Sequence, residues 1–186
     1  MKTRKIQICK WKPGSRNATV DAFVKRGAID SGAHAVAKKV LADIRRRGDR
    51  AIVACARRYD GVDLPPSAFR VRPAEMERAV SRVSAAEKRA IRKAQRHIRA
   101  FARAGMKRNW SMKTRGGGRI GEQFSPYDRV GIYVPGGEAP LVSTALMTAT
   151  LANVAGVEEV VACTPCDDER KINPVLVYAL VAAGAT

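Results

Sequence analysis

Apolar side chains recur at helical spacing in the N-terminal part of the chain. Between residues 31 and 58, the apolar positions of this pattern are Val36, Val40, Ile44, Ile52 and Cys55. Gly48 and Asp49 interrupt the pattern, and glycine is a poor helix former. We therefore predict two short amphipathic helices between Ser31 and Arg58, separated at Gly48.

Two further helix starts are marked by the residues that favour them. Pro73 fits the first turn of a helix, where its missing N–H needs no partner. Ser84-Ala-Ala-Glu87 has the form of a capping box, in which the serine hydroxyl and the glutamate carboxylate each accept a backbone N–H. An apolar stripe from Ala90 to Phe101 continues this second helix. Before Pro73, the run from Phe69 to Val71 predicts a short strand.

The C-terminal part alternates between strand and helix patterns. After a glycine run that we expect to be a flexible connection, Gly116–Gly118, the predicted elements are a strand at Arg129–Val134, a helix at Leu141–Val154, a strand at Glu158–Thr164 and a helix at Asn173–Ala183. Strands that alternate with helices pair in parallel. The predicted class is α/β: an N-terminal helical segment followed by an incomplete Rossmann-like parallel β-α-β-α unit.

The charge changes sign along the chain and suggests a boundary between two domains. The net charge is +18, but residues 1–128 contain 32 Lys and Arg against 11 Asp and Glu, whereas residues 129–186 contain 3 against 6. We therefore predict a basic, mainly helical segment at 1–128 and an incomplete nucleotide-binding unit at 129–186. No apolar run reaches the roughly 20 residues of a membrane helix. A cytoplasmic location without membrane contact is expected.

One predicted helix has a strongly basic face, which raises the alternative of a nucleic-acid or polyanion binding module. The basic residues on and after this helix are Lys88, Arg89, Arg92, Lys93, Arg96, Arg99, Arg103, Lys107 and Arg108. Such a face neutralises phosphates. The segment lacks interleaved aromatic residues for base stacking and has no known DNA-binding motif, so we rank this function second.

The four cysteines do not suggest disulfides or a metal site. Cys163 and Cys166 have the C-x-x-C spacing, but a zinc site needs further ligands and the remaining cysteines are isolated. We expect Cys163 to be buried at a strand end and Cys166 to lie in the following loop.

The loop after the first predicted strand contains the residues best suited to bind a ligand. It runs from Pro135 to Pro140 at the carboxyl end of that strand, where parallel sheets bind ligands. Gly136 and Gly137 lack Cβ atoms, so backbone can approach a ligand closely, and the helix start near Ser143 and Thr144 offers unpaired N–H groups to an anion. Tyr133 can stack on a ring. The residues alone are equally consistent with a plain strand-to-helix turn.

A long motif here resembles the signature of the histidinol dehydrogenase family. Residues 129–140 read RVGIYVPGGEAP, followed by STALM at 143–147 and AGVEEV at 155–160, and the similarity extends upstream through RGDRA at 47–51 and YDG at 59–61. The resemblance implies two NAD-dependent steps that oxidise L-histidinol to L-histidine in histidine biosynthesis, by a cytoplasmic, zinc-dependent homodimer. It also implies that Tyr133 contacts NAD. Pro135, Gly136 and Gly137 are nominated as cofactor-binding by their place in the loop.

The resemblance assigns no catalytic or metal-binding residue to this chain. In the family, the zinc ligands and the acid–base pair lie further along the sequence, and the only histidines here are His34 and His97, neither in a matching motif. We therefore expect an N-terminal fragment that is inactive and poorly stable alone. Alternatives from the sequence are a paralogue acting on another small alcohol, and a non-catalytic partner that docks on a full-length homologue.

Overall fold

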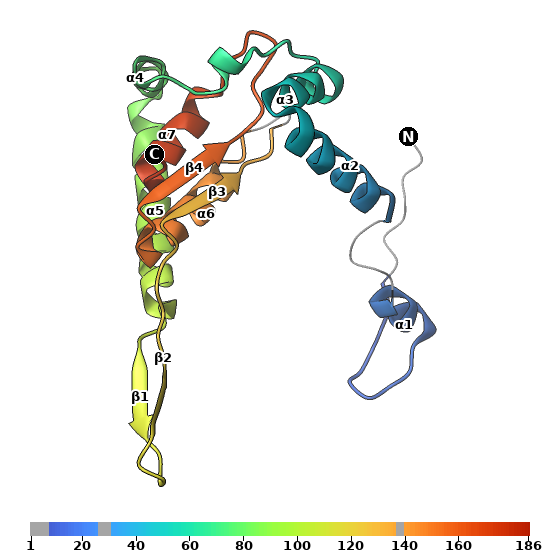
Figure 1. Cartoon of the computed structure of the whole chain (residues 1–186), viewed down its shortest axis with the longest axis vertical. Helices are drawn as coiled ribbons and strands as arrows, with labels where there is room; N and C mark the ends of the chain where they lie inside the picture. The colour runs from blue at the N-terminus through green and yellow to red at the C-terminus, as the bar shows by residue number, and fades with distance from the viewer. Residues whose placement is uncertain (1–7, 26–30, 137–139) are drawn as a thin grey trace. The chain divides into compact units, whose positions relative to one another are not determined.

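The computed structural model describes residues 8–25, 31–136 and 140–186 (Figure 1). Its internal contacts group the chain into two compact units, Met1–Ile52 and Val53–Thr186. The change of charge near residue 128 is a separate, compositional boundary, and the predicted domain division there stays a prediction.

The first unit contains helices α1 (Ala18–Lys25) and α2 (Ser31–Arg47), and helix α3 (Asp49–Cys55) crosses into the second unit. Asn17 begins α1, because its side-chain oxygen accepts the N–H groups of Thr19 and Val20 at 3.0 and 3.3 Å. Gly48 separates α2 from α3 with a φ of 57°, which glycine adopts at little cost. The predicted pair of helices broken at Gly48 is confirmed.

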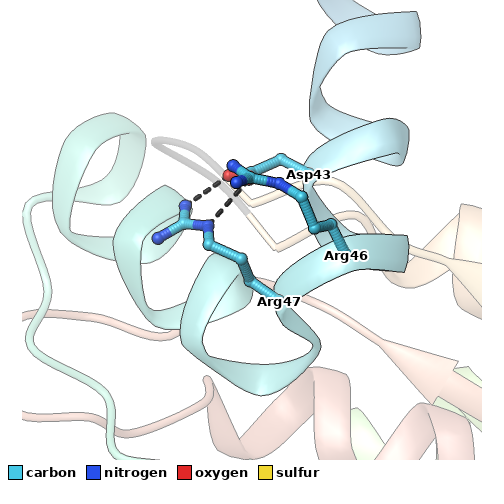
Figure 2. A network of polar contacts seen from close by, with 3 residues as sticks. All are labelled: Asp43, Arg46 and Arg47. Atoms are coloured by element: carbon cyan, nitrogen blue, oxygen red, sulfur yellow. Dashed lines mark hydrogen bonds and ion pairs between the residues drawn. The ribbon is translucent and has the colours of Figure 1, made fainter.

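Asp43 is the acceptor of an arginine cluster on α2 (Figure 2). Arg47 Nε donates to Asp43 Oδ1 at 2.7 Å, and a second Arg47 nitrogen contacts the other oxygen. Arg46 Nη2 lies 3.0 Å from Oδ1. The hydrogen bond from Arg47, reinforced by Arg46, lowers the pKa of Asp43 from 3.8 to about 2.

This shift is directly measurable. Carbon-detected NMR of the side-chain carboxyl should show Asp43 titrating near pH 2. Because the folded-state pKa is depressed, the stabilisation from this contact is complete above pH 3.8 and is lost as the pH falls toward 2. Replacing Arg47 with Gln should move the pKa back toward 3.8. Arg45→Gln on the same helix is the control, and an equal rise in both variants contradicts the assignment.

The second unit contains the remaining elements. After α3 these are a π-helical turn at Ala56–Asp60, a 3-10 turn at Pro66–Ala68, α4 (Pro73–Ser81), α5 (Ala85–Gly105), β1 (Trp110–Lys113), β2 (Arg119–Glu122), β3 (Arg129–Tyr133), α6 (Val142–Ala155), β4 (Glu159–Cys163) and α7 (Pro174–Ala183). The strand predicted at Phe69–Val71 is wrong. The N–H of Phe69 closes the preceding turn on the Pro66 carbonyl at 3.2 Å, so the segment does not extend.

The predicted capping box at the start of α5 is confirmed. The N–H of Glu87 donates to Ser84 Oγ at 3.2 Å, and the N–H of Ser84 donates to Glu87 Oε2 at 2.9 Å. Ile91 is buried, with Ile98 partly buried against the same core. Phe101 is 80% exposed, so the buried part of the stripe is shorter than predicted.

Loss of the cap should weaken the fold by a predictable amount. We expect Ser84→Ala to lower the free energy of unfolding by about 1 kcal/mol, the usual contribution of a serine cap. Guanidinium denaturation followed by circular dichroism measures the change. Ser81→Ala removes an exposed hydroxyl that only contacts the Arg78 carbonyl, so this control should change stability less. Equal effects count against the capping box as a stabilising feature.

The glycine run predicted to be a flexible connection is instead the turn of a β-hairpin. Strands β1 and β2 pair antiparallel, with Met112 opposite Ile120. The turn closes through a hydrogen bond from the Thr114 N–H to the Gly118 carbonyl at 2.8 Å, and Gly117 has a φ of 85°. Every residue of both strands is exposed.

Strands β3 and β4 form a parallel pair, as predicted, with α6 as the connection between them (Figure 1). Alternate residues point to opposite faces. Val130 and Ile132, opposite Val160 and Ala162, contact the hydrophobic core. The other face carries Tyr133 opposite Cys163, and both are exposed.

The core lies between the inner face of this sheet and three helices. Ile91 of α5, Leu146 of α6 and Tyr178 of α7 are buried in one cluster. The Tyr178 hydroxyl accepts a hydrogen bond from Arg92 Nε at 2.8 Å. Arg92, on the basic side of α5, thus contacts α7 although its side chain is exposed. In the described part of the chain, each helix is too short or too polar to cross a bilayer.

Candidate functional site

A cavity of about 520 Å³ lies at the carboxyl ends of β3 and β4. Three groups of residues line it, from the loop after β3, from the loop after β4 and from the start of α7, together with one residue that follows α4. The lining residues are Arg82, Pro135, Gly136, Pro140, Thr164, Pro165, Cys166, Asp167, Glu169, Lys171, Ile172, Asn173, Pro174 and Leu176. This is the position at which parallel sheets bind their ligands.

The two strand-end loops contact each other at Gly136. The N–H of Val134 donates to the Cys163 carbonyl at 2.9 Å, which carries the strand pairing one residue beyond the sheet. A Cβ added at Gly136 would lie 3.2 Å from both Cβ and Cγ of Pro165. Gly136 therefore serves close packing between loops at the edge of the cavity.

The loop after β4 is organised by Asp167. Its Oδ1 accepts the N–H groups of Glu169 at 3.0 Å and Lys171 at 2.8 Å, and its own N–H donates to the Lys171 carbonyl at 2.9 Å. The Lys171 ammonium pairs with the Glu169 carboxylate. The carboxylates of Asp167 and Glu169 thus have partners within the loop.

Helix α7 begins in the wall of the cavity. Asn173 is its N-cap, with a side-chain oxygen that accepts the Val175 N–H at 2.9 Å, and Pro174 occupies the first helical position. Since the N-terminus of a helix carries a partial positive charge, this wall favours an anion. The Thr164 hydroxyl oxygen, also in the lining residue set, is buried without a hydrogen-bond partner in the described structure.

The predicted cofactor residues divide into three cases. Pro135 and Gly136 line the cavity. Tyr133 does not, and its side chain is exposed at the end of β3 on the face away from the core. Gly137 lies outside the described residues. Their roles in binding a cofactor stay predictions.

The helix that begins at the cavity is α7 and not α6, whose start was predicted to face an anion. Ser143 and Thr144 at the start of α6 are absent from the cavity lining, whereas α7 begins there. Ligands bind at the carboxyl ends of parallel strands, and this rule predicted the loop after β3. Applied to β4, the same rule predicts Thr164 as a site residue. Arg82 has no such local signal, because its place depends on how the helices pack.

Of the two cysteines near the cavity, one has the predicted environment and the other does not. Cys166 lies in the loop, as predicted, but Cys163 is exposed rather than buried. The reason is its register, since it alternates with the core-facing Ala162 and so points to the open face. Burial raises the pKa of the Cys166 thiol, and Asp167 adds to this rise. A raised pKa disfavours the reactive thiolate.

The described residues do not offer a zinc site. Across residues 8–25, 31–136 and 140–186, no three side chains of His, Cys, Asp or Glu converge to hold a metal ion. A catalytic zinc ion requires three protein ligands. The residues present therefore do not fit a zinc ion, whereas the cavity with its anion-favouring wall fits part of a nucleotide.

The contact at Gly136 gives a test of the site's geometry. We expect Gly136→Ala to lower the free energy of unfolding by about 1 kcal/mol, because the new methyl group overpacks against Pro165. Gly131→Ala is the control in the neighbouring strand, since a Cβ there meets no described atom within 4 Å. Denaturation midpoints of the two variants measure the difference. If Gly136→Ala is as stable as Gly131→Ala, the two loops do not pack as described.

Comparisons with known proteins identify one family. A sequence model described as histidinol dehydrogenase matches residues 25–186. The histidinol dehydrogenase of Symbiobacterium thermophilum is 44% identical over 147 residues, 79% of this chain and 34% of the relative. That of a Synechococcus species is 37% identical over 169 residues, 90% of this chain and 39% of the relative.

A solved structure agrees with these sequences. The crystal structure of histidinol dehydrogenase from Elizabethkingia anophelis matches 86% of this chain with a TM-score of 0.76 and 30% identity, and the match covers 36% of that chain. This chain thus spans between about a third and two fifths of the length of these relatives.

Proposed function

The chain belongs to the histidinol dehydrogenase family, and from this premise we propose that its cavity binds part of NAD for the oxidation of L-histidinol to L-histidine. The family makes it an oxidoreductase of histidine biosynthesis. We further propose that β3, α6, β4 and α7 form the first part of a Rossmann-like unit. The protein then acts in the cytoplasm as a homodimer.

The position of the cavity is the observation that supports this proposal. It lies at the carboxyl ends of parallel strands, where such folds bind nucleotides. Its volume of about 520 Å³ falls within the usual range of small-molecule sites, roughly 300–1,000 Å³. Pro135 and Gly136 of the family motif line it.

Tyr133 has a distinct part in this proposal. Its ring is exposed beside the strand-end loops without lining the cavity. We assign it to the part of the dinucleotide that extends out of the cavity, where an aromatic ring stacks on a base. Bound NAD supplies the hydride acceptor for the oxidation.

Catalysis requires more than these residues provide. The described side chains do not fit a zinc ion, so we propose that the metal and the acid–base groups come from parts of the family fold outside the matched region. We expect the 186-residue chain alone to form no NADH from L-histidinol, NAD and zinc. Absorbance at 340 nm measures this, and a rate that scales with protein concentration would overturn the expectation.

NAD binding tests the proposed function directly. Isothermal titration of the purified chain with NAD should show saturable binding, and Tyr133→Ala should weaken it about tenfold, which corresponds to the loss of one stacked base, ~1–3 kcal/mol. Tyr127→Ala is the control, because Tyr127 is also an exposed tyrosine and is not part of the cavity lining. Absence of NAD binding by the wild type counts against the site. An equal loss in both variants counts against Tyr133.

The alternatives from the sequence have less support. A polyanion-binding face on α5 is weakened because Arg92 donates to the buried Tyr178 and Lys88 lies over the same ring at 5.7 Å. These two cations are already used in packing against α7. Docking of the chain on a full-length homologue stays a prediction.

A further inference from the structure

Arg82 is held at the cavity by a short junction between two helices. It is the C-cap of α4, and its N–H donates to the Ala79 carbonyl at 3.1 Å, while the Val83 N–H donates to the Val80 carbonyl at 3.3 Å. The next residue, Val83, is buried in the hydrophobic core, and Ser84 begins α5 with its capping box. Because Val83 is buried and Ser84 is part of the capping box, the Arg82 backbone is held in one place in the lining of the cavity.

The charges around the cavity single out Arg82. Lys171 is paired with Glu169, and Asp167 accepts two backbone N–H groups. Arg82 is one of the residues that line the same cavity, and in the described structure its exposed side chain has neither an ion pair nor a hydrogen bond. The N-terminal end of α7, whose first residues also line the cavity, adds partial positive charge.

The backbone of the cavity is a poor source of donors for an anion. Proline lacks an N–H, and four of the lining residues are prolines: Pro135, Pro140, Pro165 and Pro174. A glycine-rich phosphate loop binds phosphates through successive backbone N–H groups. This site lacks that series in its described part, so an anion bound here depends on side-chain donors.

We propose that Arg82 binds the diphosphate of the dinucleotide in this cavity. The inference deepens the proposed function and rests on it. A guanidinium presents two parallel N–H groups to two phosphate oxygens, which suits a diphosphate better than a single point charge does. The Thr164 hydroxyl, which lines the same cavity without a partner in the described chain, donates a further hydrogen bond to it.

The test compares ADP with adenosine, which differ in the diphosphate. Isothermal titration of the full chain at low salt should give tighter binding of ADP than of adenosine. Arg82→Gln should weaken ADP binding about tenfold or more, the usual worth of a hydrogen-bonded charge, and leave adenosine binding unchanged. Arg82→Lys keeps the charge but not the paired donors, so its ADP affinity should lie between those of the wild type and Arg82→Gln.

Arg78→Gln is the matched control on the same helix, since Arg78 donates to the Ala74 carbonyl and is not part of the cavity lining. It should bind ADP like the wild type. An equal loss in both glutamine variants shows a general charge effect and overturns the proposal. Circular dichroism checks that each variant folds, and the intermediate affinity of Arg82→Lys separates lost recognition from lost structure.

The remaining outcomes separate this inference from the proposed function. If the wild type binds ADP and Arg82→Gln binds it equally well, the role of Arg82 is wrong while the nucleotide site stands. If inorganic pyrophosphate binds as tightly as ADP, the site recognises free phosphates rather than a dinucleotide, and the proposal is overturned. If the wild type binds neither ADP nor adenosine, the proposed function fails, and the inference fails with it.

Discussion

The parallel pairing of β3 with β4 is the constraint on which the rest of the second unit depends. Parallel strands cannot be joined by a tight turn and need a crossover, here α6, which covers one face of the pair. The pairing also brings both carboxyl ends to one edge, so that Gly136 meets Pro165 and the cavity forms between their loops. The pairing of β3 with β4 therefore determines the position of both the core and the candidate site.

That pairing also leaves one sheet face uncovered within the described residues. Parallel sheets normally have helices on both faces, yet Gly131, Tyr133 and Cys163 are exposed on this one. The chain spans at most two fifths of the relatives compared above, so their folds contain polypeptide that has no counterpart in the match. Any layer placed over this face meets Tyr133, so a covering surface and the proposed nucleotide site share that residue.

Caps, helix breakers and apolar periodicity in the sequence predicted most helices and both parallel strands. They failed where contacts between distant segments decide the structure. Ser84 caps α5 through its hydroxyl, three residues from its Glu87 partner, and Gly48 acts through its own backbone, so the local sequence shows both roles. The segment at Phe69–Val71 has strand composition but closes a turn instead. The hairpin at Gly116–Gly118 was missed because its strands are only four residues long and fully exposed. In the site, Pro135 and Gly136 were predictable from the strand-end rule. Arg82 was not, because the packing of α4 against α7 brings it there.

The two oppositely charged segments of the chain both contribute residues to the lining of the cavity. The segment that supplies both strand-end loops has a net charge of −3, and Asp167 and Glu169 lie in the lining. The one cationic side chain that this segment contributes to the described lining, Lys171, is already paired with Glu169. In the proposed site the compensating cation is Arg82, from the segment whose net charge is +21. On this proposal, the basic helical segment contributes to the nucleotide site through one arginine rather than through its total charge, which salt screens over about 10 Å.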